Sequence, residues 1–196
     1  MLTQLSTIKS RLAIPAADLT NDDLLTSAIA SVTARFDKET NRTLARRVSA
    51  THEFDATDTE ILPPLYPIET VTKWETKSSE AEGWKQQPVT GYLIRAGSVI
   101  SLSSALSPPS STPALARLTY TGGYVLPGTD PALGQTPLPD DLEQAAVEQV
   151  AYWFETRDKL GLKNYWPSGG IYLAFTGADL LPSVKAVLAS YQRWTI

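Results

Sequence analysis

Cysteine is absent from this 196-residue chain, and histidine occurs once, as His52. Disulfide bonds, cysteine-ligated zinc, thiol catalysis and a metal site built from several histidines are therefore excluded. The chain also lacks a P-loop, a dinucleotide-binding glycine motif and a nucleophile elbow. A Ser-His-Asp triad would need His52, which lies in a strand-like pattern between Thr51 and Glu53. The sequence therefore predicts a protein that is not an enzyme and that carries no cofactor and no metal.

Long apolar runs are missing as well. No stretch approaches the ~18 apolar residues that a membrane-spanning helix needs, and the first ten residues lack the apolar core of a signal peptide. The net charge is −4, so the basic excess typical of a general nucleic-acid-binding surface is absent. Hydrophobic residues make up 42% of the chain, enough for a folded core. We expect a soluble protein with no membrane partner, made and used in the cytoplasm.

The most regular stretch, residues 138–160, has the pattern of an amphipathic helix. Pro139 suits the first turn of a helix, and Asp140 and Asp141 suit its positive end. At about 100° per residue, one face is apolar: Leu142, Ala146, Val147, Val150, Trp153 and Phe154. Another face is acidic within about 100° of arc: Asp140, Asp141, Glu148, Glu155 and Asp158. Packing against a core explains the apolar face, and the acidic face is a candidate functional surface.

Three further helices are expected from apolar periodicity. One covers residues 3–12, one follows a capping box at 20–23 and runs to about Asn41, and a short one begins at Pro182. The second helix places Leu24, Leu25, Ala28, Ile29, Val32 and Phe36 on one face. Its end is basic, with Lys38, Arg42, Arg46 and Arg47. We interpret these four residues as a solvated helix end, with phosphate contact as the alternative.

The region between the helices favours short strands. Strand patterns occur at 49–55, 68–76, 84–88, 92–94, 99–102 and 115–120, with a hairpin turn at Ala96-Gly97. Residues 103–113 read as a Ser- and Pro-rich loop, and 124–137 as an extended connection. One block of strands between helices favours an α+β fold. We predict a single domain over 1–196, with a small helical bundle from 1–47 and 138–196 and a β-rich insertion over 48–123. The bundle has two N-terminal helices, one long C-terminal helix and one short C-terminal helix.

The five tryptophans fall into two groups. Trp74, Trp84 and Trp153 lie in regular patterns and are expected in the core. Trp166 lies in a Gly-rich aromatic loop and Trp194 in the tail. One alternative function is therefore a carbohydrate- or ligand-binding module that uses Tyr165, Trp166 and Tyr172.

Several segments follow one another in a specific order. They are residues 34–44, the Pro-rich 62–72, the Arg-Leu-Thr-Tyr-Thr-Gly-Gly-Tyr segment 117–124, then 138–145 with 151–157, and finally 181–193. Their succession resembles the head–tail connector (adaptor) proteins of tailed bacteriophages and of gene transfer agents. The resemblance covers nearly the whole chain.

The resemblance implies a structural virion protein at the head–tail junction, assembled in the host bacterial cytoplasm. Such adaptors attach beneath the portal protein after DNA packaging and form a ring, expected to be a dodecamer. The ring extends the channel, through which double-stranded DNA passes without specific binding. It also gives a docking surface for the stopper or tail-completion protein. A stopper or tail-completion protein is itself an alternative reading, and such proteins are dominated by β-structure.

Two sets of residues are candidates for these roles. A lumen that lets DNA slide should repel phosphates, so Asp140, Glu148, Glu155 and Asp158 are expected to face the channel, with the acidic β-rich insertion as the alternative. In relatives the C-terminal segment commonly reaches the portal. The tail combines Tyr, Arg and Trp, a composition common in binding anchors. We therefore expect portal contacts from Tyr191, Arg193, Trp194 and Ile196.

Overall fold

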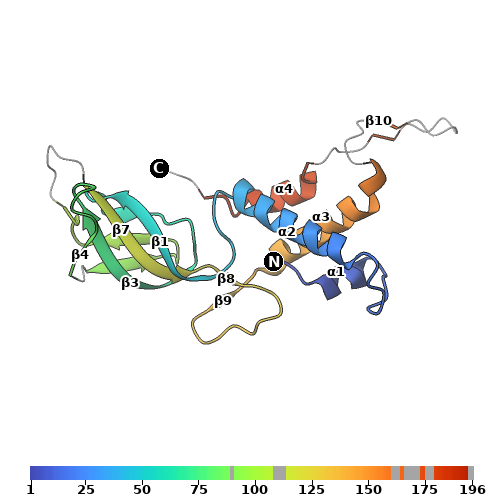
Figure 1. Ribbon diagram of the computed structural model, residues 1–196, viewed down its shortest axis with the longest axis horizontal. Helices are drawn as coiled ribbons and strands as arrows, with labels where there is room; N and C mark the ends of the chain where they lie inside the picture. Colours follow the sequence, from blue (N-terminus) through green and yellow to red (C-terminus); the bar gives the residue numbers. More distant parts are fainter. Residues whose placement is uncertain (89–90, 108–113, 160–163, 166–172, 175–178, 194–196) are drawn as a thin grey trace. The chain divides into compact units, whose positions relative to one another are not determined.

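The computed structural model describes all residues except 89–90, 108–113, 160–163, 166–172, 175–178 and 194–196. It contains two compact units (Figure 1). A helical unit comprises Met1–Asn41, Leu126–Thr129 and Leu138–Gln192, and a β unit comprises Arg42–Val125, Asp130–Pro137 and Arg193–Ile196. Helices and antiparallel sheets coexist, so the prediction of a mixed α+β fold is confirmed.

The helical unit packs its other helices around α3. Its α-helices are α1 (Leu5–Arg11), α2 (Asp22–Glu39), α3 (Asp140–Glu155) and α4 (Pro182–Ala189), and α3 contacts each of the other three. Most residues of the apolar faces predicted from the 3.6-residue period are buried: Leu25, Ile29, Val32 and Phe36 of α2, Leu142, Ala146, Val147 and Val150 of α3, and Val184 and Leu188 of α4. Burial of these faces against one another explains why short helices such as α1 and α4 are stable here.

The predicted capping box at the start of α2 is wrong. The N-cap residue is Asn21, and its side chain makes no capping hydrogen bond. Instead, Asp18 Oδ1 accepts a hydrogen bond from the Thr20 N–H at 3.0 Å, which places Thr20 in the preceding turn.

The end of α2 also differs from the expected basic terminus. The helix ends at Glu39, because Thr40 Oγ1 donates to the Phe36 carbonyl at 2.7 Å and Asn41 adopts a left-handed conformation with φ of 51°. Arg42 therefore lies in the β unit, where its buried guanidinium stacks over the Tyr66 ring. Arg46 lies in the same unit and binds Glu69 through both Nε and Nη2. The interpretation of Arg42 and Arg46 as a solvated helix end is thus wrong.

The last predicted turn of α3 is not α-helical. The helix ends at Glu155, and Arg157–Lys159 form a 3₁₀ turn. Thr156 Oγ1 donates to the Tyr152 carbonyl at 2.6 Å and Arg157 Nη1 donates to the Phe154 carbonyl at 2.7 Å, so side chains satisfy carbonyls of the final turn.

The described part of the β unit includes two antiparallel sheets. The first has the order β1-β7-β3-β4, formed by β1 (Arg47–Asp55), β7 (Leu115–Gly122), β3 (Ile68–Lys77) and β4 (Lys85–Gln86). The second has the order β2-β6-β5, formed by β2 (Glu60–Ile61), β6 (Val99–Leu102) and β5 (Tyr92–Arg95). Both sheets contribute to one apolar core: Ile61, Leu65, Ile68, Trp74, Ile100, Leu102, Leu118 and Tyr120. Of the three tryptophans expected in the core, Trp74 is buried, whereas Trp84 and Trp153 are half-buried.

The connection predicted to be extended contains two short strands. β8 (Tyr124–Val125) pairs in parallel with β9 (Thr136–Pro137), and residues 126–135 form the loop that connects them. Two further short strands, β10 (Asn164–Tyr165) and β11 (Leu173–Ala174), pair with each other. Trp166 and Tyr172 of the aromatic loop lie outside the described residues.

Candidate functional site

The acidic surface of α3 is confined to one side of the helix. Asp140 and Glu155 are exposed, Glu148 is half-buried, and Asp158 is exposed on the 3₁₀ turn that follows. Gln144 lies between Asp140 and Glu148 at four-residue spacing and donates to Glu148 Oε1 at 3.3 Å. Within the described part of the chain, none of the four carboxylates forms an ion pair. Their charge is therefore presented to solvent rather than neutralised.

The other two acids of the first turns of α3 have packing roles. Glu143 Oε1 accepts from Thr3 Oγ1 at 3.2 Å, and Asp141 accepts from the Tyr191 hydroxyl. Asp141, which the wheel places at the margin of the acidic face, is thus used to hold the segment after α4. Among the described residues, no group of three or more acidic or histidine side chains is arranged to hold a metal ion. No described helix is both long enough and apolar enough to cross a membrane.

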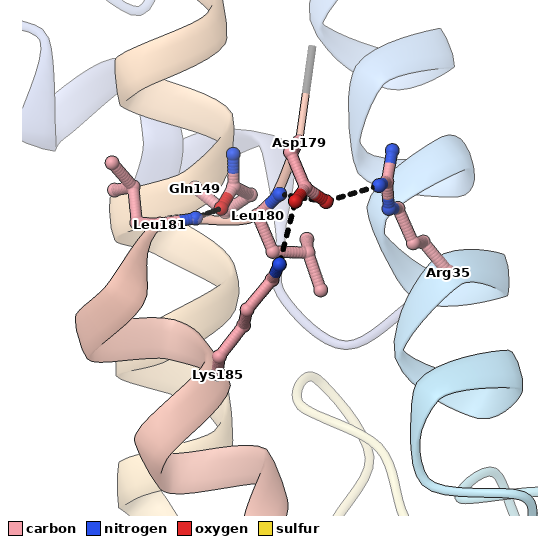
Figure 2. Close-up of polar contacts among 6 residues, drawn as sticks. All are labelled: Arg35, Gln149, Asp179, Leu180, Leu181 and Lys185. Carbon is pink, nitrogen blue, oxygen red and sulfur yellow. Dashed lines mark hydrogen bonds and ion pairs between the residues drawn. The ribbon is translucent and has the colours of Figure 1, made fainter. Parts of the chain in front are cut away.

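The residues that precede and open α4 are fixed by a polar cluster (Figure 2). The Asp179 carboxylate forms ion pairs with Arg35 of α2 and Lys185 of α4, each with a nitrogen–oxygen distance of 2.5 Å. The hydrogen bond from Lys185, followed by that from the Leu180 N–H, lowers the pKa of Asp179. Gln149 of α3 is fully buried, and its Oε1 accepts the Leu181 N–H at 2.8 Å. Because α2, α3 and α4 all contribute, this cluster links the start of the C-terminal helix to α2 and α3.

Two of the four expected portal-binding residues are bonded within the chain. The Tyr191 hydroxyl lies 2.7 and 2.9 Å from the two oxygens of Asp141, and Gln192 donates to the Glu39 carbonyl. In the β unit, Arg193 Nε donates to the Leu62 carbonyl at 3.1 Å. Trp194 and Ile196 lie outside the described residues. The structure thus shows how the base of the tail is held.

A pocket of about 320 Å³ in the β unit surrounds the only histidine. It is lined by His52, Phe54, Asp58, Glu60, Ile61, Leu62 and Arg193. His52 lies in β1, as its strand pattern predicted, and its ring stacks against Phe54 with 6.3 Å between centroids. Burial, and secondly the charge of Arg193, lower the pKa of His52 to about 4. The imidazole is therefore neutral at pH 7. Because Arg193 is distant along the chain, no pattern in the sequence predicts that it lies near His52.

The sequence pattern did not predict a second hollow, which lies between α2 and α3 and is called the α2–α3 groove. It has a volume of about 180 Å³ and is lined by Leu24, Ser27, Ala28, Ser31, Trp153, Phe154 and Arg157. The helical wheel assigned Leu24 and Ala28 to the core face of α2. In the structure, Leu24 is 49% exposed. The two serines one turn apart beside these residues are the sequence signal that this part of α2 borders on solvent.

No protein-family model matches the chain, and no curated protein matches it by sequence. Solved structures do match it in fold. A chain from the neck of an empty gene transfer agent (GTA) particle with C6 symmetry has a TM-score of 0.61 at 18% identity, covering 100% of this chain and 91% of that chain. A chain from the virion of the native GTA particle has a TM-score of 0.60 at 19% identity, covering 100% and 91%. A chain from the neck of the native GTA particle with C12 symmetry has a TM-score of 0.52 at 18% identity, covering 98% and 89%. The chain thus shares its fold, over its full length, with chains of GTA particles.

Proposed function

We propose that this chain is a structural neck protein of a tailed bacteriophage or gene transfer agent, present at the head–tail junction of the virion. The observation that carries this proposal is the fold shared with a chain from a GTA neck, over the whole of this chain and 91% of that chain. The likeness includes both the helical unit and the β unit, since it covers the whole of this chain. The role is structural rather than catalytic.

Within the neck, the proposed role is that of the adaptor beneath the portal protein. In this role the chain forms a ring, extends the DNA channel and docks the stopper or tail-completion protein. The matching necks were computed with C6 and C12 symmetry, which supports a ring and is compatible with a dodecamer. Assembly of the ring takes place in the host bacterial cytoplasm.

The unpaired acids of α3 and of the 3₁₀ turn that follows it are proposed to face the DNA channel. Asp140, Glu148, Glu155 and Asp158 have no basic partner among the described residues, so each copy adds uncompensated negative charge. A ring multiplies that charge by its number of copies. At physiological salt the repulsion of phosphates extends over a Debye length of about 8 Å, which keeps DNA from adhering to the wall.

The C-terminal tail is proposed to contact the portal protein. Tyr191 and Arg193 already bond to Asp141 and Leu62, so they hold the base of the tail. Trp194 and Ile196 then provide the direct contact, because a tryptophan at a chain end is a frequent binding anchor.

The proposal is tested by producing particles without this chain. The expected result is heads that have packaged DNA but carry no tails, together with free tails, because the docking surface is missing. Supplying the chain from a second gene copy should restore tailed particles. Tailed particles at the normal yield without the chain would contradict the proposal.

A further inference from the structure

A leucine in the loop between β8 and β9, Leu133, is fully exposed. Leu133 has the highest exposed fraction of the large apolar side chains described in the structure. It lies in the segment 130–135, which reads Asp-Pro-Ala-Leu-Gly-Gln. Covering an exposed leucine with a partner lowers the free energy, because burial removes apolar surface from water.

The backbone that carries Leu133 is held in a defined shape. The Gln135 N–H donates to the Ala132 carbonyl, and the Ala132 N–H donates to Gln135 Oε1, each at 3.0 Å. Gly134 completes this turn with φ of 86°. Nearer β8, Gly128 also has a positive φ, and a side chain there would overlap Gln4. A loop ordered in advance loses little conformational entropy when it binds, so Leu133 is suited to act as an anchor.

The α2–α3 groove offers a surface complementary to this anchor. Leu24 and Ala28 of α2 and the Trp153 and Phe154 rings of α3 give it apolar walls. Its volume of about 180 Å³ admits one aliphatic side chain. Ser27 and Ser31 lie on its rim and are exposed, so the groove is open to solvent from that side.

Charge complements this apolar match. The guanidinium of Arg157 lines the groove, lying 4.4 Å from the centroid of the Phe154 ring. Asp130 is exposed three residues before Leu133 and has no ion pair among the described residues. When Leu133 enters the groove, Asp130 on the same loop is brought toward Arg157. The opposite charges of these two side chains attract each other and favour this pairing.

We propose that the Leu133 loop of one copy binds in the α2–α3 groove of a second copy. A closed ring with cyclic symmetry needs two different, complementary surfaces on each copy, because the contact runs head to tail. The loop and the groove are two such surfaces. This inference rests on the proposed ring-forming function and names the partner of each surface: the same chain.

Chemical cross-linking tests the contact directly, because the chain has no cysteine of its own. One protein carries Ala132→Cys, at an exposed position beside the intact Leu133, and the other, enlarged by a tag, carries Ser31→Cys. The two are mixed at high concentration and treated with a short bismaleimide. The contact predicts a heterodimer band much stronger than the one formed by Ser31→Cys with Leu93→Cys, a control leucine that is 71% exposed on β5. Equal bands would overturn the proposal.

Blocking variants test whether the contact runs head to tail. Leu133→Asp removes the anchor, and Ser31→Trp fills the groove. Each variant alone should lose self-association, whereas an equal mixture should form dimers and nothing larger, since only one working contact remains. Unaltered thermal unfolding would show that the variants fold. Mixtures that assemble beyond dimers, or variants that assemble like the original chain, would refute the proposed contact.

The same variants separate this inference from the proposed function. If both variants enter necks as the original chain does, the contact is wrong while the neck role stands. If the cross-link forms but the original chain is absent from necks, the contact stands and the neck role is wrong.

Discussion

His52 is half-buried in β1, and its pKa lies well below the value of an exposed imidazole. Its burial and the nearby Arg193 guanidinium favour the neutral imidazole and lower its pKa from 6.5 to about 4. The unfolded chain therefore binds a proton between these two values that the folded chain does not. Stability from this group is fully present above about pH 6.5 and is lost as the pH falls toward 4.

The first prediction follows from this linkage. The free energy of unfolding should fall by about 1–2 kcal/mol between pH 7 and pH 4.5 because of His52, after allowance for screening of a partly exposed ring. His52→Gln should remove this part of the pH dependence, as measured by urea unfolding at both pH values. Nuclear magnetic resonance can follow the imidazole without overlap, since the chain has a single histidine. A pKa of 6.5 in the folded protein would contradict the prediction.

The hairpin between β5 and β6 gives a second prediction at the residue scale. Ala96 has φ of 47° and Gly97 has φ of 65°, so both central residues of the turn are left-handed. Asparagine tolerates this conformation better than alanine, and Asn-Gly is the preferred pair for such turns. Ala96→Asn should therefore stabilise the protein by about 0.5–1 kcal/mol, as measured by thermal unfolding. Ala81→Asn, at an exposed turn residue without a positive φ, should change little; an equal gain there would point to a different cause.

At the scale of elements, the contact between α3 and α4 depends on Gln149. Gln149→Ala removes the acceptor of the Leu181 N–H and leaves a cavity under the start of α4. We expect a loss of about 2–4 kcal/mol in the free energy of unfolding. Gln144→Ala, on the exposed side of the same helix, should stay within about 0.5 kcal/mol. Similar losses from both variants in denaturant unfolding would show that the buried hydrogen bond has no special weight.

Periodic patterns made most elements predictable. The apolar faces of α2 and α3 follow from their 3.6-residue spacing, and β1, β3, β5, β6 and β7 from alternation and turn signals. Helix ends were less predictable, because Thr40 and Thr156 end α2 and α3 through hydrogen bonds to backbone carbonyls. The parallel pair of β8 and β9 could not be predicted, since it brings together short segments without strand periodicity.

The candidate surfaces show the same limit. The helical spacing of Asp140, Glu148 and Glu155 predicts that these three acids lie on one face of one helix. No local pattern predicts that Asp141 binds Tyr191 or that Arg193 binds Leu62, because these contacts join residues far apart in the sequence. The α2–α3 groove likewise needs the relative placement of two helices that only the folded unit provides.

At the scale of the whole molecule, the acidic surface of α3 predicts an effect on DNA movement. Replacing Asp140, Glu148, Glu155 and Asp158 by their amides should slow DNA ejection from particles, because the channel wall would repel phosphates less. Amide replacements at Glu53, Asp58 and Glu80, exposed acids of the β unit, serve as the comparison. If only the β-unit set alters ejection, the channel is lined by the β unit and the assignment to α3 is wrong.

The most direct test of the neck role is particle mass in solution, for this chain alone and mixed with the portal protein of the same particle. The account predicts a stoichiometric ring of this chain on the portal. It also predicts weaker assembly for a variant that lacks residues 194–196 but retains Tyr191 and Arg193. A chain that leaves the mass of the portal unchanged would contradict the adaptor role.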